Sequence, residues 1–180
     1  MRVFDHAMGL SALVVALAGC STKGGSGDVK PMPAAVMTAP PTPLTPQLPI
    51  GEHTVHVEAD SGSGLVLYRV TVDETSTKLD FTFTNHGQRA TNVTVAPPGD
   101  KHAMFLEWGP DKKARFQSAT GIATTPKQTT IPAGQSLSFS LVFGPLDVGV
   151  TTFDMYEGED AKKVMPGAQT YWVVRNIPLK

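Results

Sequence analysis

The side chain with the most specific chemistry is the thiol of Cys20, the only cysteine in the 180-residue chain. A thiol is a nucleophile that can accept an acyl chain, and a single cysteine excludes both an internal disulfide framework and a cysteine-based zinc cluster. Cys20 directly follows an uncharged, mostly apolar run at residues 10–19. A membrane-spanning helix needs roughly 20 such residues, whereas a signal peptide needs only about 7–15. The segment therefore predicts a signal peptide that ends at a reactive cysteine.

The residues that end this run, Leu17-Ala18-Gly19-Cys20, resemble the lipobox, the cleavage motif of bacterial lipoproteins. In that family the cysteine is acylated with palmitate-type chains, the bond before it is cut, and the cysteine becomes the first residue. Several acyl chains hold a protein on a membrane, whereas one chain binds only marginally. The resemblance therefore implies a lipid anchor at Cys20 and the lipid bilayer as a partner. In lipoproteins of the enterobacterial type, an Asp directly after the cysteine favours retention in the inner membrane. By the same resemblance, Ser21 implies the outer membrane, facing the periplasm.

The residues after Cys20 indicate a tether. Residues 21–30 are small and polar, and the stretch 31–49 contains seven prolines. Proline lacks an amide donor and fixes φ, so this stretch cannot form a regular helix or an interior strand. It predicts a flexible start followed by a semi-rigid spacer. A proline-rich recognition motif for a partner groove is the alternative interpretation.

His102-Ala103-Met104 is the one pattern that suggests a metal. On a strand, side chains two residues apart point the same way, and imidazole with a thioether suits Cu(I). The pair resembles the His-x-Met ligands of periplasmic copper chaperones, which use further methionine ligands. In this chain Met155 and Met165 could supply those ligands. The fuller spacing of Met and His in that family is not matched. Met104 also shares a face with Leu106 and Trp108, which is typical of a core position. We therefore expect no cofactor, with copper as the alternative.

The other polar clusters have plainer interpretations. The acidic residues around Gly158 follow no recognised calcium-loop spacing, so they predict a solvated turn. The basic residues between 112 and 115 predict a solvated hairpin. Three aromatic residues could line a sugar-binding surface, although Tyr171 and Trp172 would point to opposite faces of a strand. No Gly-x-Ser-x-Gly elbow is present, so we expect no enzyme. The acidic cluster is Asp154, Glu157, Glu159 and Asp160, the basic cluster is Lys112, Lys113 and Arg115, and the aromatic residues are Trp108, Tyr171 and Trp172.

Period-two alternation from residue 51 onward predicts the elements that position these residues. Apolar residues alternate with polar ones at 79–84 and 136–143, which indicates half-buried strands. A third strand would place Val66, Tyr68, Val70 and Val72 on one face. Shorter candidate strands lie at 53–58, 91–95, 103–108, 114–118, 151–156 and 169–175.

Short strands separated by turn signals every 8–15 residues favour an all-β, immunoglobulin-like β-sandwich. A Greek-key barrel or a cupredoxin-like sandwich is the alternative. Residues 130–143, in which a Pro-x-Gly turn leads into an alternating strand, resemble a segment common in bacterial immunoglobulin-like domains. We expect a signal peptide at 1–19, the lipidated cysteine and a disordered Pro-rich tether at 20–50, and the sandwich domain at 51–180.

The net charge of −1 excludes a strongly basic nucleic-acid binder. The sequence favours a non-enzymatic structural or protein-interaction module of the cell envelope, whose partner is an envelope protein or the cell wall. Copper handling through His102 and Met104 is one alternative. The other is an enzyme inhibitor that works through an exposed loop such as 97–102 or 119–128.

Overall fold

The computed structural model of the chain describes residues 49–60, 62–165 and 171–180. These residues form an all-β unit, which confirms the predicted class. One short 3-10 helix, η1 (Glu159–Lys163), is the only helical element among them, and no helix in this part has the length and apolarity of a membrane span. The strands are β1 (Gly51–Glu58), β2 (Leu65–Val72), β3 (Thr77–Thr84), β4 (Thr91–Val93), β5 (Met104–Gly109), β6 (Lys112–Thr120), β7 (Thr129–Ile131), β8 (Ser136–Phe143), β9 (Thr152–Glu157) and β10 (Val173–Pro178).

The predicted signal peptide and almost all of the predicted tether lie outside the described residues. Leu17, Ala18, Gly19 and Cys20 lie outside the described residues, so the lipobox and the three predicted regions stay predictions.

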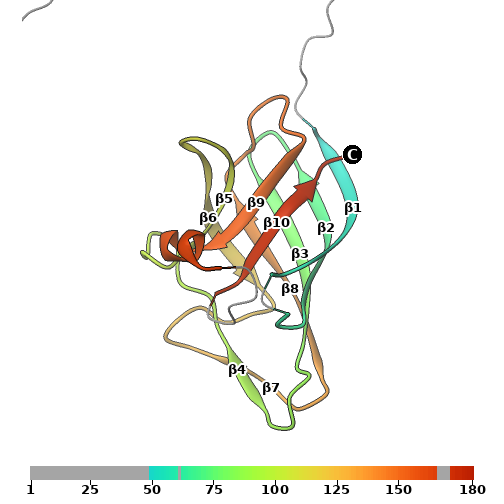
Figure 1. Cartoon of the computed structure of the whole chain (residues 1–180), viewed down its shortest axis with the longest axis vertical. Helices are drawn as coiled ribbons and strands as arrows, with labels where there is room; N and C mark the ends of the chain where they lie inside the picture. Colours follow the sequence, from blue (N-terminus) through green and yellow to red (C-terminus); the bar gives the residue numbers. More distant parts are fainter. Residues whose placement is uncertain (1–48, 61, 166–170) are drawn as a thin grey trace, which may run out of the picture. The chain divides into compact units, whose positions relative to one another are not determined.

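Eight strands form one antiparallel sheet in the order β1-β2-β3-β8-β6-β5-β9-β10. The two end strands, β1 and β10, contact each other, so the sheet nearly closes on itself (Figure 1). β4 and β7 form a separate two-stranded ribbon, seen at the bottom of Figure 1. This arrangement shows a nearly closed sheet, while the immunoglobulin-like arrangement stays a prediction.

The interior of the sheet is filled from the alternating strands β3 and β8. Leu79, Phe81 and Phe83 of β3 are buried, and they pair with Leu141, Phe139 and Leu137 of β8. The rings of Phe81 and Phe139 stack with centroids 5.4 Å apart. Side chains from the other long strands join them in one core. The predicted alternation of these two strands is therefore confirmed.

The prediction for β2 is wrong in the first half of the strand. Val70 and Val72 are buried as expected, but Val66 is only partly buried and Tyr68 is exposed, while Leu65 and Leu67 lie in the core. The pairing register with β3 shifts between Leu67 and Arg69, which leaves Tyr68 as an extra residue. An extra residue in one strand reverses the side-chain alternation, so a strict period of two could not hold along the whole strand.

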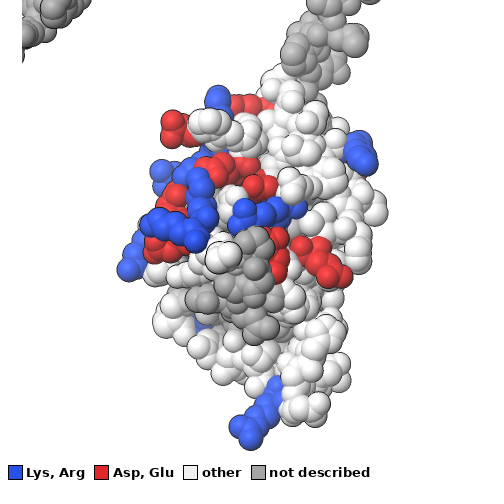
Figure 2. All heavy atoms as spheres, in the orientation of Figure 1, with Lys and Arg blue, Asp and Glu red and all other residues white. Residues whose placement is uncertain are grey.

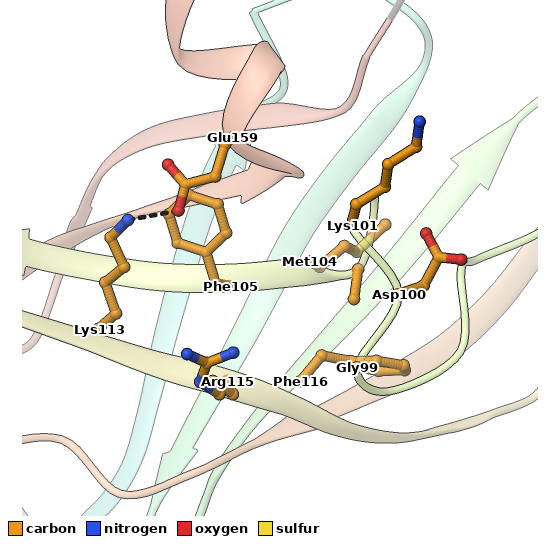
Figure 3. Close-up of a pocket in the computed structure, with 10 residues that line it drawn as sticks. Gly99, Asp100, Lys101, Met104, Phe105, Lys113, Arg115, Phe116 and Glu159 are labelled. Carbon is orange, nitrogen blue, oxygen red and sulfur yellow. Dashed lines mark hydrogen bonds and ion pairs between the residues drawn. The ribbon is translucent and has the colours of Figure 1, made fainter.

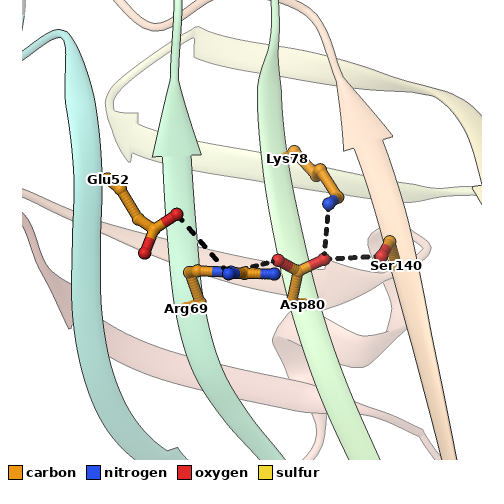
Figure 4. A network of polar contacts seen from close by, with 5 residues as sticks. All are labelled: Glu52, Arg69, Lys78, Asp80 and Ser140. Atoms are coloured by element: carbon orange, nitrogen blue, oxygen red, sulfur yellow. Dashed lines mark hydrogen bonds and ion pairs between the residues drawn. The ribbon is translucent and has the colours of Figure 1, made fainter.

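A charged network crosses the outer face of β1, β2, β3 and β8 (Figure 4). The carboxylate of Asp80 accepts a hydrogen bond from Arg69 Nε at 2.6 Å and another from the Ser140 hydroxyl at 2.5 Å. Lys78 Nζ lies 3.0 Å from Asp80 Oδ1, and Glu52 lies 3.4 Å from Arg69. The Asp80 side chain is only 2% exposed. Burial alone would raise the pKa of Asp80, but the hydrogen bonds from Ser140, Arg69 and Lys78 hold it below its usual range.

Asn85 joins the end of β3 to the segments that carry the β4–β7 ribbon. The residue is 5% exposed. Its Nδ2 donates to the carbonyl oxygens of Arg89 at 2.8 Å and Ile131 at 3.0 Å, and its Oδ1 accepts from the amide of Gly87 at 3.0 Å. The side chain therefore satisfies two backbone groups of its own loop and one, the carbonyl oxygen of Ile131, that lies 46 residues away in the sequence.

Replacing Asn85 with alanine is expected to lower the free energy of unfolding by about 1–2 kcal/mol, because the carbonyl oxygen of Ile131 loses its hydrogen bond in a buried position, and Arg89 and Gly87 lose theirs in part-buried ones. Urea unfolding followed by tryptophan fluorescence measures this change. Asn92→Ala is the matched control, because Asn92 is exposed and accepts one hydrogen bond, from Thr130. Equal losses in the two variants would contradict the role of Asn85 at the junction.

Candidate binding site

The predicted copper pair is split between a turn and the core. His102 lies in the turn before β5, and Met104 is the first residue of β5 and is 2% exposed. The two residues are therefore not neighbours on one strand face, which was the premise of the prediction. Within the described ranges, no group of three or more His, Cys, Asp and Glu side chains is arranged to hold a metal. Copper binding stays a prediction that these contacts do not test.

The four acidic residues near Gly158 have separate partners. Glu159 forms an ion pair with Lys113 at 2.5 Å, and this contact holds the pKa of Glu159 below its usual range. Asp160 pairs with Lys163 at 3.1 Å. Asp154 accepts a hydrogen bond from the Tyr156 hydroxyl at 2.8 Å. Burial and this bond raise the pKa of Tyr156 to about 12.

Glu157 is the most enclosed member of the acidic group. Burial raises its pKa above the usual range, although its carboxylate accepts a hydrogen bond from the Trp172 amide at 2.8 Å. This bond fixes the chain as it enters β10. The acidic residues thus hold structure together rather than converge on one point.

The three basic residues of the β5–β6 hairpin differ in their pairing. Lys112 binds Asp147 at 2.7 Å, and Lys113 binds Glu159. Arg115 is exposed and forms no ion pair with any residue that the structure describes. Figure 2 shows basic and acidic side chains intermingled over η1 and the strands beside it. The charge that is left unmatched at this hairpin is therefore that of Arg115.

Arg115 borders a hollow of about 300 Å³, which we call the hairpin hollow (Figure 3). Its walls come from the loop before β5, from the two strands β5 and β6, and from η1. The apolar part consists of Ala103, Met104, Phe105 and Phe116, and the polar part of Gly99, Asp100, Lys101, Lys113, Arg115 and Glu159. This size and this mixture of an apolar lining with a few charged groups are typical of small-ligand sites.

The strand register places the charged groups against the aromatic wall. Phe105 and Arg115 are direct cross-strand partners. Lys113 lies two residues from Arg115 on β6, so both side chains leave the same face. The ammonium group of Lys113 lies 4.6 Å from the centre of the Phe105 ring, within range of a cation–π interaction. Figure 3 shows Lys113 reaching Glu159, with Arg115 farther along the same strand.

Local hydrogen bonds fix the loop that forms the opposite wall. The amide of Asp100 donates to the carbonyl oxygen of Pro97 at 3.2 Å, and the Asp100 carboxylate accepts from the His102 amide at 2.8 Å. Gly158 allows this loop to pack against the end of β9. A Cβ atom on Gly158 would lie 3.0 Å from the Cα atom of His102, and its φ of 77° also favours glycine.

The aromatic candidates belong mainly to packing. Trp108 and Trp172 pack against the main core, and Tyr171 packs against a smaller cluster that contains Phe105 and Tyr156. The predicted strand 169–175 is β10, Val173–Pro178, so Tyr171 and Trp172 precede it. Both line a wider hollow of about 620 Å³ beside Glu157. Tyr171 directly follows residues 166–170, which lie outside the described part.

The sequence singled out Lys113 and Arg115 only as a basic hairpin and did not point to Phe105 or Lys101 as their neighbours. The alternation in β5 would have placed Phe105 and Met104 on opposite faces of the strand. The turn at 97–103 gave no indication that Lys101 lies close to the hairpin. That proximity depends on the contact between the loop and Gly158.

Comparisons with known proteins do not place the chain in a family. No protein-family model matches it, and no curated protein is similar to it. Among solved structures, the crystal structure of a functionally unknown protein from Listeria monocytogenes is weakly similar, with 11% identity and a TM-score of 0.38. The match covers 74% of this chain and 90% of that one. A likeness at this level carries no argument about fold or function.

Proposed function

We propose that the chain is a lipid-anchored, non-enzymatic binding module of the bacterial cell envelope, held on the outer membrane and facing the periplasm. The observation that carries the proposal is the motif Leu17-Ala18-Gly19-Cys20 at the end of a short apolar run, with Cys20 as the only cysteine. Acyl chains on Cys20 would hold the mature chain permanently on the bilayer. No cofactor is needed for this function.

The Pro-rich stretch supports a spacer role within this proposal. Fully extended at about 3.1 Å per residue, the 19 residues at 31–49 would reach roughly 60 Å. That reach would let the domain meet an envelope protein or the cell wall away from the lipid surface. The tether would thus set the working distance of the domain.

The finer fold assignment, an immunoglobulin-like sandwich, is part of the same proposal. Its support is the antiparallel pairing of neighbours throughout the eight-stranded sheet and the main core inside it. In such a sandwich the loops at the strand ends are free to bind partners, and the loop 97–103 beside the hairpin hollow is one of these. Copper handling and enzyme inhibition remain the alternative predictions, and no contact among the described residues favours either of them.

Mass spectrometry of the protein purified from the membranes of its source bacterium tests the anchor. The expected mature chain begins at Cys20 and carries a mass increase that corresponds to two or three acyl chains. Alkaline hydrolysis is expected to remove the ester-linked chains. A chain that retains residues 1–19, or one with an unmodified Cys20 thiol, would overturn the proposal.

A further inference from the structure

We infer that the hairpin hollow binds a carboxylate group attached to a small apolar body, such as the free C-terminus of a peptide that ends in an aliphatic residue. This inference rests on the proposed function, because it names the ligand class of a binding module. It combines two features of the hollow, an apolar floor and cationic groups without ion pairs.

The apolar floor is formed by side chains that are held rigidly by the fold. Met104 is 2% exposed, Phe105 is 7% exposed and Phe116 is 4% exposed, so their positions are set by packing. The ring of Phe116 packs edge to face against that of Phe143, with ring centroids 5.8 Å apart. A rigid apolar surface loses little conformational freedom when a ligand covers it. It would contact an aliphatic group of the ligand.

The charged rim favours an anion. Three cations and two anions line the hollow, so its formal charge is 3 − 2 = +1. Lys113 is already matched by Glu159. Arg115 and Lys101 form no ion pair within the described ranges, and the carboxylate of Asp100 accepts the amide of its own loop. Arg115 and Lys101 are therefore the groups that can receive a ligand anion.

The geometry favours a carboxylate over a larger anion. The planar guanidinium of Arg115 can form two parallel hydrogen bonds with a carboxylate. Phe105, its cross-strand partner, would lie beside the apolar body of the same ligand. A phosphate group carries a charge of about −1.5 to −2 at pH 7, which exceeds the formal charge of +1 at the hollow. The shared chemistry is that of an apolar carboxylate, supplied either by a peptide C-terminus or by a simple organic acid.

The test is an amide-shift titration of the full-length chain in detergent, followed by NMR. The probes are N-acetyl-L-leucine, its uncharged amide N-acetyl-L-leucinamide, and hexanoate. We expect saturable shifts with N-acetyl-L-leucine, centred on residues 99–105 and 113–116. Arg115→Gln is expected to weaken binding by about tenfold or more, the loss expected for one charge-assisted contact. Arg89→Gln, an exposed arginine on another loop, is the matched control and is expected to bind normally.

Hexanoate identifies the source of the carboxylate. Binding of both acids would indicate any apolar carboxylate, and binding of N-acetyl-L-leucine alone would indicate a peptide C-terminus. Acetate serves as a fourth probe that has the carboxylate without the apolar body. The inference is overturned if the amide binds as tightly as N-acetyl-L-leucine, if acetate binds as tightly as N-acetyl-L-leucine and hexanoate, or if Arg115→Gln has no effect. The side chain of Arg115 is exposed, so the variant should fold, and the spread of its amide signals checks this. The mass of the anchored N-terminus does not depend on these results, so the two proposals fail separately.

Discussion

Replacing Cys20 with alanine is expected to shift the protein almost completely from the membrane fraction to the soluble fraction. The thiol of Cys20 is the only one in the chain that can accept acyl chains, and each buried CH₂ group of an acyl chain contributes about 0.8 kcal/mol to membrane binding. The measurement is fractionation of the source bacterium, followed by immunoblotting of each fraction.

Ser21→Ala is the matched control, because it changes the neighbouring residue and leaves the motif at 17–20 intact. This variant is expected to stay in the membrane fraction. A second variant, Ser21→Asp, is expected to move the protein from the outer to the inner membrane if the sorting rule of the resembled lipoproteins holds. If Cys20→Ala fractionates like the wild type, the thiol is not the anchor.

The strands that pack on one face only were predictable from the sequence alone. Apolar and polar residues alternate from Leu79 to Thr84 in β3 and from Ser136 to Leu141 in β8, and the structure pairs the two strands residue for residue from Thr77 to Thr84. The alternation reflects a simple physical condition, a core on one side and water on the other. Where that condition holds along the whole strand, the pattern in the sequence is sufficient.

Irregular pairing explains where the prediction was wrong. Tyr68 is an extra residue in β2, and it reverses the side-chain direction within an otherwise regular pattern. The sequence contains no separate signal for this bulge, because Val66, Tyr68, Val70 and Val72 fit a straight strand equally well. β7, at Thr129–Ile131, was not predicted, because three residues are too few to show a period.

The candidate site was less predictable than the fold. Lys113 and Arg115 were visible as a basic hairpin, but the hollow also needs the loop 97–103 and Glu159. These segments are brought together by contacts between residues far apart in the sequence, such as the ion pair between Lys113 and Glu159. A single sequence carries no periodic signal for such contacts. The role of Asp80 was hidden for the same reason, because it occupies an outward position that normally faces water.

Asp80→Asn is expected to lower the free energy of unfolding by about 2 kcal/mol at pH 7, because it weakens hydrogen bonds to a charged group that is almost inaccessible to water. Asp80→Ala removes all three contacts and is expected to cost about 3 kcal/mol. Arg69 and Lys78 are 37% and 42% exposed, so each can return to water when its partner is lost. This partial exposure keeps the cost at the lower end of the range for buried pairs. Glu52→Ala, at the exposed end of the network, is the control and is expected to change little.

The dependence on pH separates the charge of Asp80 from its shape. The contacts lower the pKa of Asp80 in the folded state, so its contribution is fully present above its unfolded pKa, about 3.9. That contribution is lost as the pH falls through the lower, folded value. Chemical denaturation at a series of pH values should therefore show the wild type and Asp80→Asn converging below about pH 4. A gap that stays constant down to the lowest pH would mean that packing or hydrogen-bond shape, rather than the carboxylate charge, stabilises this face of the sheet.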